Sequence, residues 1–160
     1  APEFIDSLSF TPVIYAHISH AGKCIQERFA PRYYDAVGYG LLLYARPFNG
    51  PAAFGASACL DGTSLLPELS EEGKMQHGSF NIKRHSQTKD EIIFRFPEIK
   101  LETIQKAIAA STRSCLVRRG DLVCMELCPV QPLCSRQEEA FSIELASEKQ
   151  IILSFKIIFA

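Results

Sequence analysis

The chain has 160 residues, with 17 basic and 18 acidic side chains and a formal net charge of −1 at pH 7. This length predicts a single domain over residues 1–160, in which residues 1–7 are disordered or do not belong to the native protein. The balanced charge disfavours an extended nucleic-acid or membrane surface. No stretch approaches the roughly 20 apolar residues that a membrane-spanning helix needs.

The first predicted elements are a strand and a short helix. Residues 8–18 have the pattern of an opening strand, and we expect Pro12 at an edge or a bulge because proline donates no backbone hydrogen bond. Gly22 then opens a short amphipathic helix that has Ile25 and Phe29 on one face, four residues apart.

A second helical turn and further strands follow. Pro31 fits the first position of a new helical turn. Residues 41–45 are apolar on both faces, as in a strand that is buried on both sides. Residues 58–60 predict another strand, which ends at an Asp61-Gly62 turn. Residues 64–76 are polar and rich in glutamate, which indicates a surface segment.

The middle of the chain predicts two strands and the clearest helix. Residues 80–83 form one strand, and residues 89–96 form the next, which leads to Pro97. We expect Pro97 in the first turn of a helix. The apolar stripe of this helix is made by Leu101, Ile104 and Ile108.

The last third of the chain reads as β-structure. A tight turn at Gly120-Asp121 leads into a strand over residues 122–127, and residues 141–145 alternate as a half-buried strand. Residues 151–159 are largely apolar, and we expect this strand to be paired or buried at an interface because it is too apolar for a free edge.

The sequence contains six cysteines and two short basic runs that are candidate sites. The cysteines lack the C-x-x-C spacing of common zinc sites, so we interpret them as buried or half-buried free thiols. A thiol pair or a metal site with His17 and His20 is the alternative. The basic runs at 83–85 and 118–119 are interpreted as solvated turns and not as an anion site. The cysteines are Cys24, Cys59, Cys115, Cys124, Cys128 and Cys134.

Residues 22–46 carry a longer motif. The pattern G-K-x-I-x-E-R-x-A-x-x-Y-Y-D-A-V, followed by a strand that ends with Ala45-Arg46, resembles the fumarylacetoacetate hydrolase-like family. The similarity is to short bacterial members of the acylpyruvate hydrolase or isomerase type. It implies an α+β, β-rich fold, in which a mixed and strongly bent sheet, or β-roll, carries short helices.

The resemblance also implies a metal site that this chain has lost. In the family an E-x-E pair on the opening strand and an aspartate on a later strand hold magnesium or manganese, since hard divalent ions prefer carboxylate oxygen. The matching positions here are Thr11, Val13 and Leu42, and no acidic residue lies between Asp6 and Glu27. We therefore expect no metal, no cofactor and no catalytic residue.

Two further stretches suggest a pocket. Residues 46–55 are similar to the family pattern K-G-F-D-G-x-A-A-x-G, whose lysine contacts substrate. Residues 116–129 resemble L-x-x-G-D-x-x-x-T-G-T-P, but Glu126 stands where the family has the glycine of its pocket turn. The pocket candidates are Arg46, Asn49, Glu126 and Cys128.

Three functions remain open from the sequence. The first is a non-catalytic protein that keeps the fold for a binding or structural role. The second is a divergent acylpyruvate-type hydrolase or isomerase with Mg or Mn, with ligands drawn from His17, His20, Asp61 or the cysteines. The third is a non-catalytic subunit of a hetero-oligomer with a related chain. A homodimer is the alternative assembly. Residues 1–4 lack the basic start of a signal peptide, so we expect a cytoplasmic protein.

Overall fold

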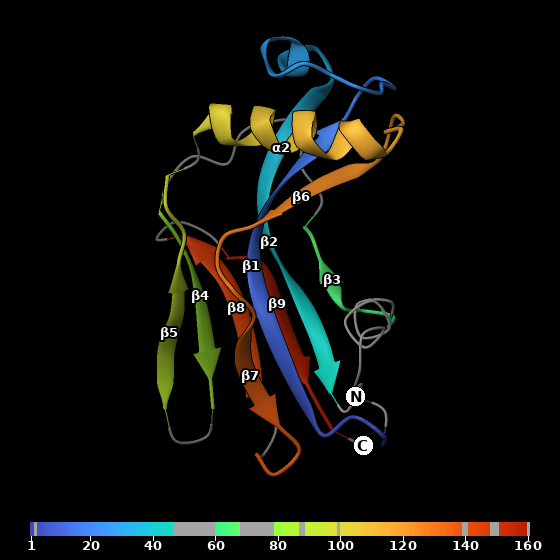
Figure 1. Ribbon diagram of the computed structural model, residues 1–160. Helices are drawn as coiled ribbons and strands as arrows, with labels where there is room; N and C mark the ends of the chain where they lie inside the picture. Colours follow the sequence, from blue (N-terminus) through green and yellow to red (C-terminus); the bar gives the residue numbers. More distant parts are fainter. Residues whose placement is uncertain are drawn as a thin grey trace.

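The computed structural model describes residues 1, 3–46, 60–67, 79–86, 89–98, 100–138, 141–147 and 151–159. Strands dominate these residues, and their one α-helix crosses the upper part of β1 and β2 in the view of Figure 1. The elements are β1 (Ser7–Ile18), η1 (Glu27–Arg32), β2 (Tyr34–Arg46), β3 (Ser64–Leu65), β4 (Phe80–His85), β5 (Asp90–Arg95), α2 (Leu101–Ser114), β6 (Leu122–Glu126), β7 (Gln131–Ser135), β8 (Phe141–Ser147) and β9 (Ile151–Ile157).

The first sheet is built around β1. On one side β1 pairs with β2, which in turn pairs with β3; on the other side β6 pairs with residues 13–17 and β7 with residues 7–10. Pro12 lies where the partner changes, and its carbonyl accepts a hydrogen bond from Leu127 N at 3.0 Å. The expectation of an edge or bulge at Pro12 was wrong, because β1 is a continuous central strand. The proline is tolerated there because its missing N–H faces the gap between the β6 and β7 ladders.

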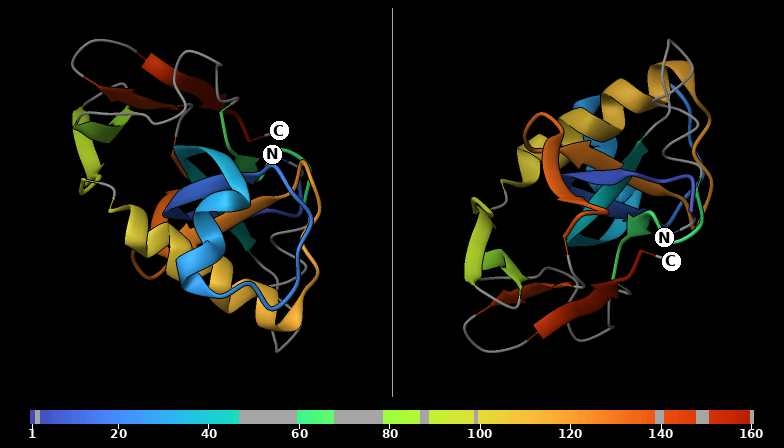
Figure 2. Two further views of the ribbon diagram at one scale, coloured as in Figure 1. Left: turned by 90° about the horizontal axis from the view of Figure 1, so that it is seen from above. Right: turned by 90° about the horizontal axis from the view of Figure 1, so that it is seen from below.

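The second sheet has the order β5-β4-β8-β9. All strand pairs among the described residues are antiparallel, whereas a mixed sheet was expected; the β-rich α+β class itself is confirmed. The two end-on views of Figure 2 show this sheet beside the first one.

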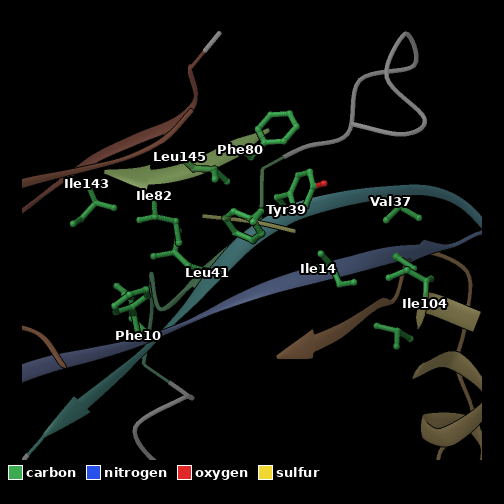
Figure 3. Packing of buried hydrophobic residues seen from close by; sticks show 14 of the residues in the cluster. Phe10, Ile14, Val37, Tyr39, Leu41, Phe80, Ile82, Ile104, Ile143 and Leu145 are labelled. Atoms are coloured by element: carbon green, nitrogen blue, oxygen red, sulfur yellow. The ribbon is translucent and has the colours of Figure 1, made fainter. Parts of the chain in front are cut away.

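The core lies between the two sheets. The Tyr39 ring on β2 is 4.6 Å from the Phe80 ring on β4, and 4.7 Å from the Phe96 ring, measured between centroids. Burial of such apolar side chains stabilises by about 25 cal/mol for each Å² removed from water. Figure 3 shows side chains of both sheets pointing toward one another, among them Phe10, Leu41, Ile82, Ile143 and Leu145.

Helix α2 covers one end of the first sheet. Its predicted stripe is confirmed at Ile104 and Ile108, which are fully buried, while Leu101 is 37% exposed. Thr112, also buried, connects the helix to the loop between β1 and η1: its Oγ1 donates to Ile108 O at 2.8 Å and accepts from Ile25 N at 3.1 Å. The helix therefore packs by its apolar face, as its sequence period requires.

Two local predictions in the helical regions were wrong. Residues 22–29 do not form an amphipathic helix with a second one after Pro31; a single 3-10 helix, η1, contains Pro31, and Ile25 is buried ahead of it. Phe29 is instead 38% exposed, with the guanidinium of Arg28 at 4.6 Å from its ring centroid. Pro97 is not in the first turn of α2, because that helix begins at Leu101.

The strands predicted at 80–83, 89–96, 122–127, 141–145 and 151–159 are confirmed as β4, β5, β6, β8 and β9. The turns at Gly62 and Gly120 are confirmed too, and both glycines have positive φ. Strands β3 and β7 were not predicted. The strand predicted at 58–60 and most of the segment 64–76 lie outside the described residues.

The N-terminal segment is tied to the fold where the structure describes it. Ile5 is 2% exposed, and Arg136 Nη2 donates to the carbonyls of Glu3 and Ile5 at 2.9 and 3.0 Å. Among the described residues, α2 is too short and polar to cross a membrane, and η1 is shorter still.

Candidate functional site

The three positions at which the resemblance places metal ligands lie together on one face of the first sheet, which we call the Thr11 face. Thr11 is directly opposite Leu42 in the β1–β2 ladder, and Val13 is two residues further along β1. Since side chains two residues apart share one face of a strand, Thr11, Val13 and Leu42 point to the same side. Thr11 and Val13 are fully buried.

Glu126 joins this group from the other side of β1. It is opposite Val13 in the β1–β6 ladder, so it also belongs to the Thr11 face. The phenol of Tyr44, on β2, donates to Glu126 Oε1 at 2.8 Å. Because β1 lies between β2 and β6, this hydrogen bond reaches across the central strand. Burial and the bond to Glu126 raise the pKa of Tyr44, so the phenol stays protonated and donates.

Thr11 uses its hydroxyl within the protein. Its Oγ1 donates to the carbonyl of Cys128 at 2.8 Å, and Gln131 Nε2 donates to Cys128 Sγ at 3.3 Å. Burial raises the pKa of the Cys128 thiol. The residue that replaces the first expected carboxylate therefore ties β1 to the turn between β6 and β7.

Further along the same face, Tyr15 and Cys124 are opposite one another in the ladder. The Tyr15 hydroxyl donates to the carbonyl of Pro67, and burial raises its pKa. Burial also raises the pKa of Cys124 to about 11. At neutral pH this thiol is protonated and is a poor nucleophile, because reactivity belongs to the thiolate.

The segment after β3 covers part of the Thr11 face. Gly40, opposite Val13, has the Leu65 carbonyl and the Leu66 side chain so close that an added Cβ would stand 2.8 and 2.6 Å from them. A larger residue than glycine would therefore push this segment away from β2.

The residues present do not fit a divalent metal ion. Val13 and Leu42 offer no donor atom, the Thr11 hydroxyl is bonded to a carbonyl, and Cys124 holds its proton. Glu126 is the one carboxylate that the register places beside Thr11 and Val13, and it already accepts from Tyr44. Within the described part of the chain, no three His, Cys, Asp or Glu side chains are arranged to hold a metal. Magnesium and manganese prefer carboxylate oxygens, and among the described residues the register places only that of Glu126 on this face.

The structure brings two of the four pocket candidates together. Glu126 and Cys128 both lie at the Thr11 face. Arg46 is exposed and pairs with Ser7, six residues along β1 from Val13, which is about 20 Å at the rise of a strand. Asn49 lies outside the described residues.

The ligands suggested for a divergent metal site are spread over the molecule. His17 Nδ1 is 2.6 Å from Asp35 Oδ1 at the end of β1, and His20 Nδ1 is 3.0 Å from Ser19 Oγ. Asp61 lies in a turn near the other end of the sheet, two residues before Thr63, whose carbonyl accepts a hydrogen bond from Leu43 N.

The cysteine interpretation holds only in part. Among the described residues five cysteines are free thiols; Cys134, Cys124 and Cys128 are buried or half-buried, but Cys24 and Cys115 are exposed. Cys59 is outside the described residues.

Sequence reasoning missed Tyr44 and Tyr15 as members of this face. A signal was present, since Tyr44 is two residues from Leu42 and Tyr15 is two residues from Val13. What the sequence does not show is that β6 lies on the far side of β1, which is what brings Glu126 within reach of Tyr44.

Comparisons with known proteins show which solved structures share this fold. No model of a known protein family matches the sequence, and no curated protein sequence matches it. Solved structures do match. A candidate fumarylacetoacetate hydrolase family protein from Yersinia pestis has a TM-score of 0.64 and 17% identity over 96% of this chain and 74% of its own.

Two further structures agree. A 5-carboxymethyl-2-hydroxymuconate delta-isomerase from Mycobacterium smegmatis has a TM-score of 0.62 and 12% identity, and it matches 97% of this chain and 59% of its own. A maleylpyruvate hydrolase from Sphingobium has a TM-score of 0.67 and 9% identity, over 98% of this chain and 57% of its own. The fold is therefore that of fumarylacetoacetate hydrolase family proteins, and the chain spans little more than half of the latter two.

Proposed function

We propose that this chain is a non-catalytic protein with a fumarylacetoacetate hydrolase-like fold, which uses that fold for binding and not for metal-assisted chemistry. The observation that carries the proposal is the composition of the Thr11 face. The positions expected to hold carboxylates meet in space, but Thr11, Val13 and Leu42 fill them, and the nearby Glu126 is bonded to Tyr44. A metal-assisted hydrolase needs a bound dication to stabilise developing negative charge, and the described residues of this face offer no set of ligands for one.

The direct test is metal binding by the intact chain. Calorimetric titration with Mg²⁺ and with Mn²⁺ is expected to show no saturable binding in the micromolar range. Glu126→Gln serves as the site-directed control, since Glu126 is the carboxylate that the Thr11 face contains. Micromolar binding that Glu126→Gln abolishes would refute the proposal and favour the divergent enzyme.

A second measurement tests activity without reference to metal affinity. Turnover of acylpyruvates and of oxaloacetate is assayed with each metal and again with a chelator. We expect no rate above the protein-free background under either condition. A rate that the chelator removes would establish the hydrolase or isomerase alternative.

The binding role that we propose involves a second chain. Strand β9 pairs with β8 on one side, and no described strand pairs with its other side. Exposed apolar side chains lie at its first residue, Ile151 (58%), and just after its last, at Ile158 (57%). An unpaired apolar edge strand is a template for pairing with another chain, so we propose a homodimer through β9.

Light scattering during size-exclusion chromatography decides this assembly. The wild-type chain is expected to elute as a dimer, and Ile151→Lys together with Ile158→Lys is expected to shift it to a monomer without loss of helix and strand signal in circular dichroism. A monomeric wild type that associates only with a related subunit from the native cell would replace the homodimer by the hetero-oligomer.

The free thiols of the five described cysteines support a reducing compartment, and we propose the cytoplasm.

A further inference from the structure

The end of the molecule near α2 contains a polar groove that is separate from the Thr11 face. It lies where the loop after β1, the end of η1, the start of β2 and the turn before β6 meet, and its volume is about 720 Å³. In Figure 1 the blue loop and the orange turn are both at the upper end. The polar side chains that line it are Ser19, His20, Arg32, Tyr34, Asp35 and Arg119.

The backbone that frames this groove is tied together by hydrogen bonds. Ser19 N donates to Tyr33 O at 2.8 Å, which fixes the loop after β1 to the end of η1. Gly120 N donates to Ile18 O at 2.8 Å, and Ile18 N donates to Asp121 O at 2.9 Å, so the turn that carries Arg119 is fixed to the end of β1. Groups that are distant in sequence are thus held at one place by main-chain contacts.

The groove has an excess of positive charge. Neither Arg32 nor Arg119 is within 4 Å of a carboxylate among the described residues. Asp35, the acidic residue in the lining, has its Oδ1 2.6 Å from Nδ1 of His17, which does not line the groove. The Arg32 guanidinium is 5.4 Å from the centroid of the Phe29 ring, a contact that limits its movement.

We infer that this groove binds a small molecule that carries an oxyanion, either carboxylate or phosphate, through Arg32 and Arg119. The planar guanidinium presents parallel N–H donors that match two oxygens of either anion. Ser19, His20 and Tyr34 line the same groove and carry further groups that can donate to an anion. This site is independent of the proposed function, because none of its residues belongs to the Thr11 face.

The structure distinguishes the two residues of the basic run at 118–119, which are both exposed. Arg118 and Arg119 are adjacent in the same turn, but only Arg119 lines the groove. The backbone N of Arg118 donates to Asp121 Oδ2 at 2.7 Å, which closes the turn. One of the two arginines is therefore a solvated turn residue, as the sequence suggested, and the other is available to a ligand.

Calorimetry with three probes tests the inference at low ionic strength: inorganic phosphate, pyrophosphate and malonate. We expect saturable binding of at least one, and Arg32→Gln with Arg119→Gln is expected to weaken it at least tenfold. The control is Arg113→Gln with Arg118→Gln, which removes the same charge outside the groove and is expected to weaken binding less than threefold. Arg119→Lys keeps the charge but loses the paired donors, so an intermediate loss is expected.

The relative affinities of the probes identify the ligand class, since phosphates and dicarboxylates share the oxyanion but differ in geometry. Absence of saturable binding for all three probes would overturn the inference. So would an equal loss in the control pair, which would indicate attraction by net charge alone. All four altered arginines are exposed, and unchanged melting temperatures will verify that the variants fold.

Discussion

The hydrogen bond from Tyr44 to Glu126 should be a measurable source of stability, because it joins β2 to β6 across the central strand. Tyr44→Phe removes only the hydroxyl, and the ring, 6% exposed, stays in place. A hydrogen bond to a charged group contributes about 1.5–3 kcal/mol. Since Glu126 is exposed, we expect the lower end, about 1.5 kcal/mol, or about 3–6 °C in Tm for a chain of this length.

A double-mutant cycle separates this bond from other effects of the two substitutions. Urea denaturation of Tyr44→Phe, Glu126→Ala and the double variant is expected to give a coupling energy of about 1 kcal/mol. Glu102→Ala, which removes an exposed carboxylate from α2, is the control and should be additive with Tyr44→Phe. A coupling energy indistinguishable from zero would show that the bond does not form in solution.

Three further predictions concern other parts of the fold. Gly40→Ala is expected to cost about 1–3 kcal/mol in urea denaturation, because its Cβ would meet the Leu65 carbonyl; an unchanged midpoint would contradict the close approach. Thr112→Val is expected to cost about 1–3 kcal/mol, since it leaves the amide of Ile25 buried without a partner, and Thr112→Ser should recover most of the loss. The folded-state pKa of Cys124 is raised to about 11, so its contribution to stability is complete below pH 9 and is lost as the pH rises toward 11; Cys124→Ala should flatten the stability profile there, and an identical profile would refute the assignment.

The β-rich fold could be predicted because apolar runs and motif spacing are local features of the sequence. Apolar runs predict strands, as residues 41–45 do within the buried β2 and residues 151–159 do for the edge strand β9. Thr11, Val13 and Leu42 were identified by the motif frame, and the ladder then placed them on one face. The motif therefore identified positions that share a face, while their role stays a prediction.

The misses have a common physical cause, which is that tertiary contacts override local preference. Pro97 has the chemistry of a first-turn proline, yet α2 begins only at Leu101. Phe29 has the spacing of a core residue but is 38% exposed, with an arginine beside its ring. The Tyr44–Glu126 bond depends on the order of strands in the sheet, which no local pattern encodes.

One side of β1 pairs with two different strands, β6 and β7, and this affects the order in which the protein can fold during synthesis. The β1–β2 hairpin is complete early, but β6 and β7, which satisfy the other edge of β1, come near the end of the chain. At about 5–20 residues per second, a ribosome leaves that edge unpaired for several seconds. The nascent chain therefore passes through a stage in which its most buried strand is still open to other partners, and a chaperone would act best in that interval.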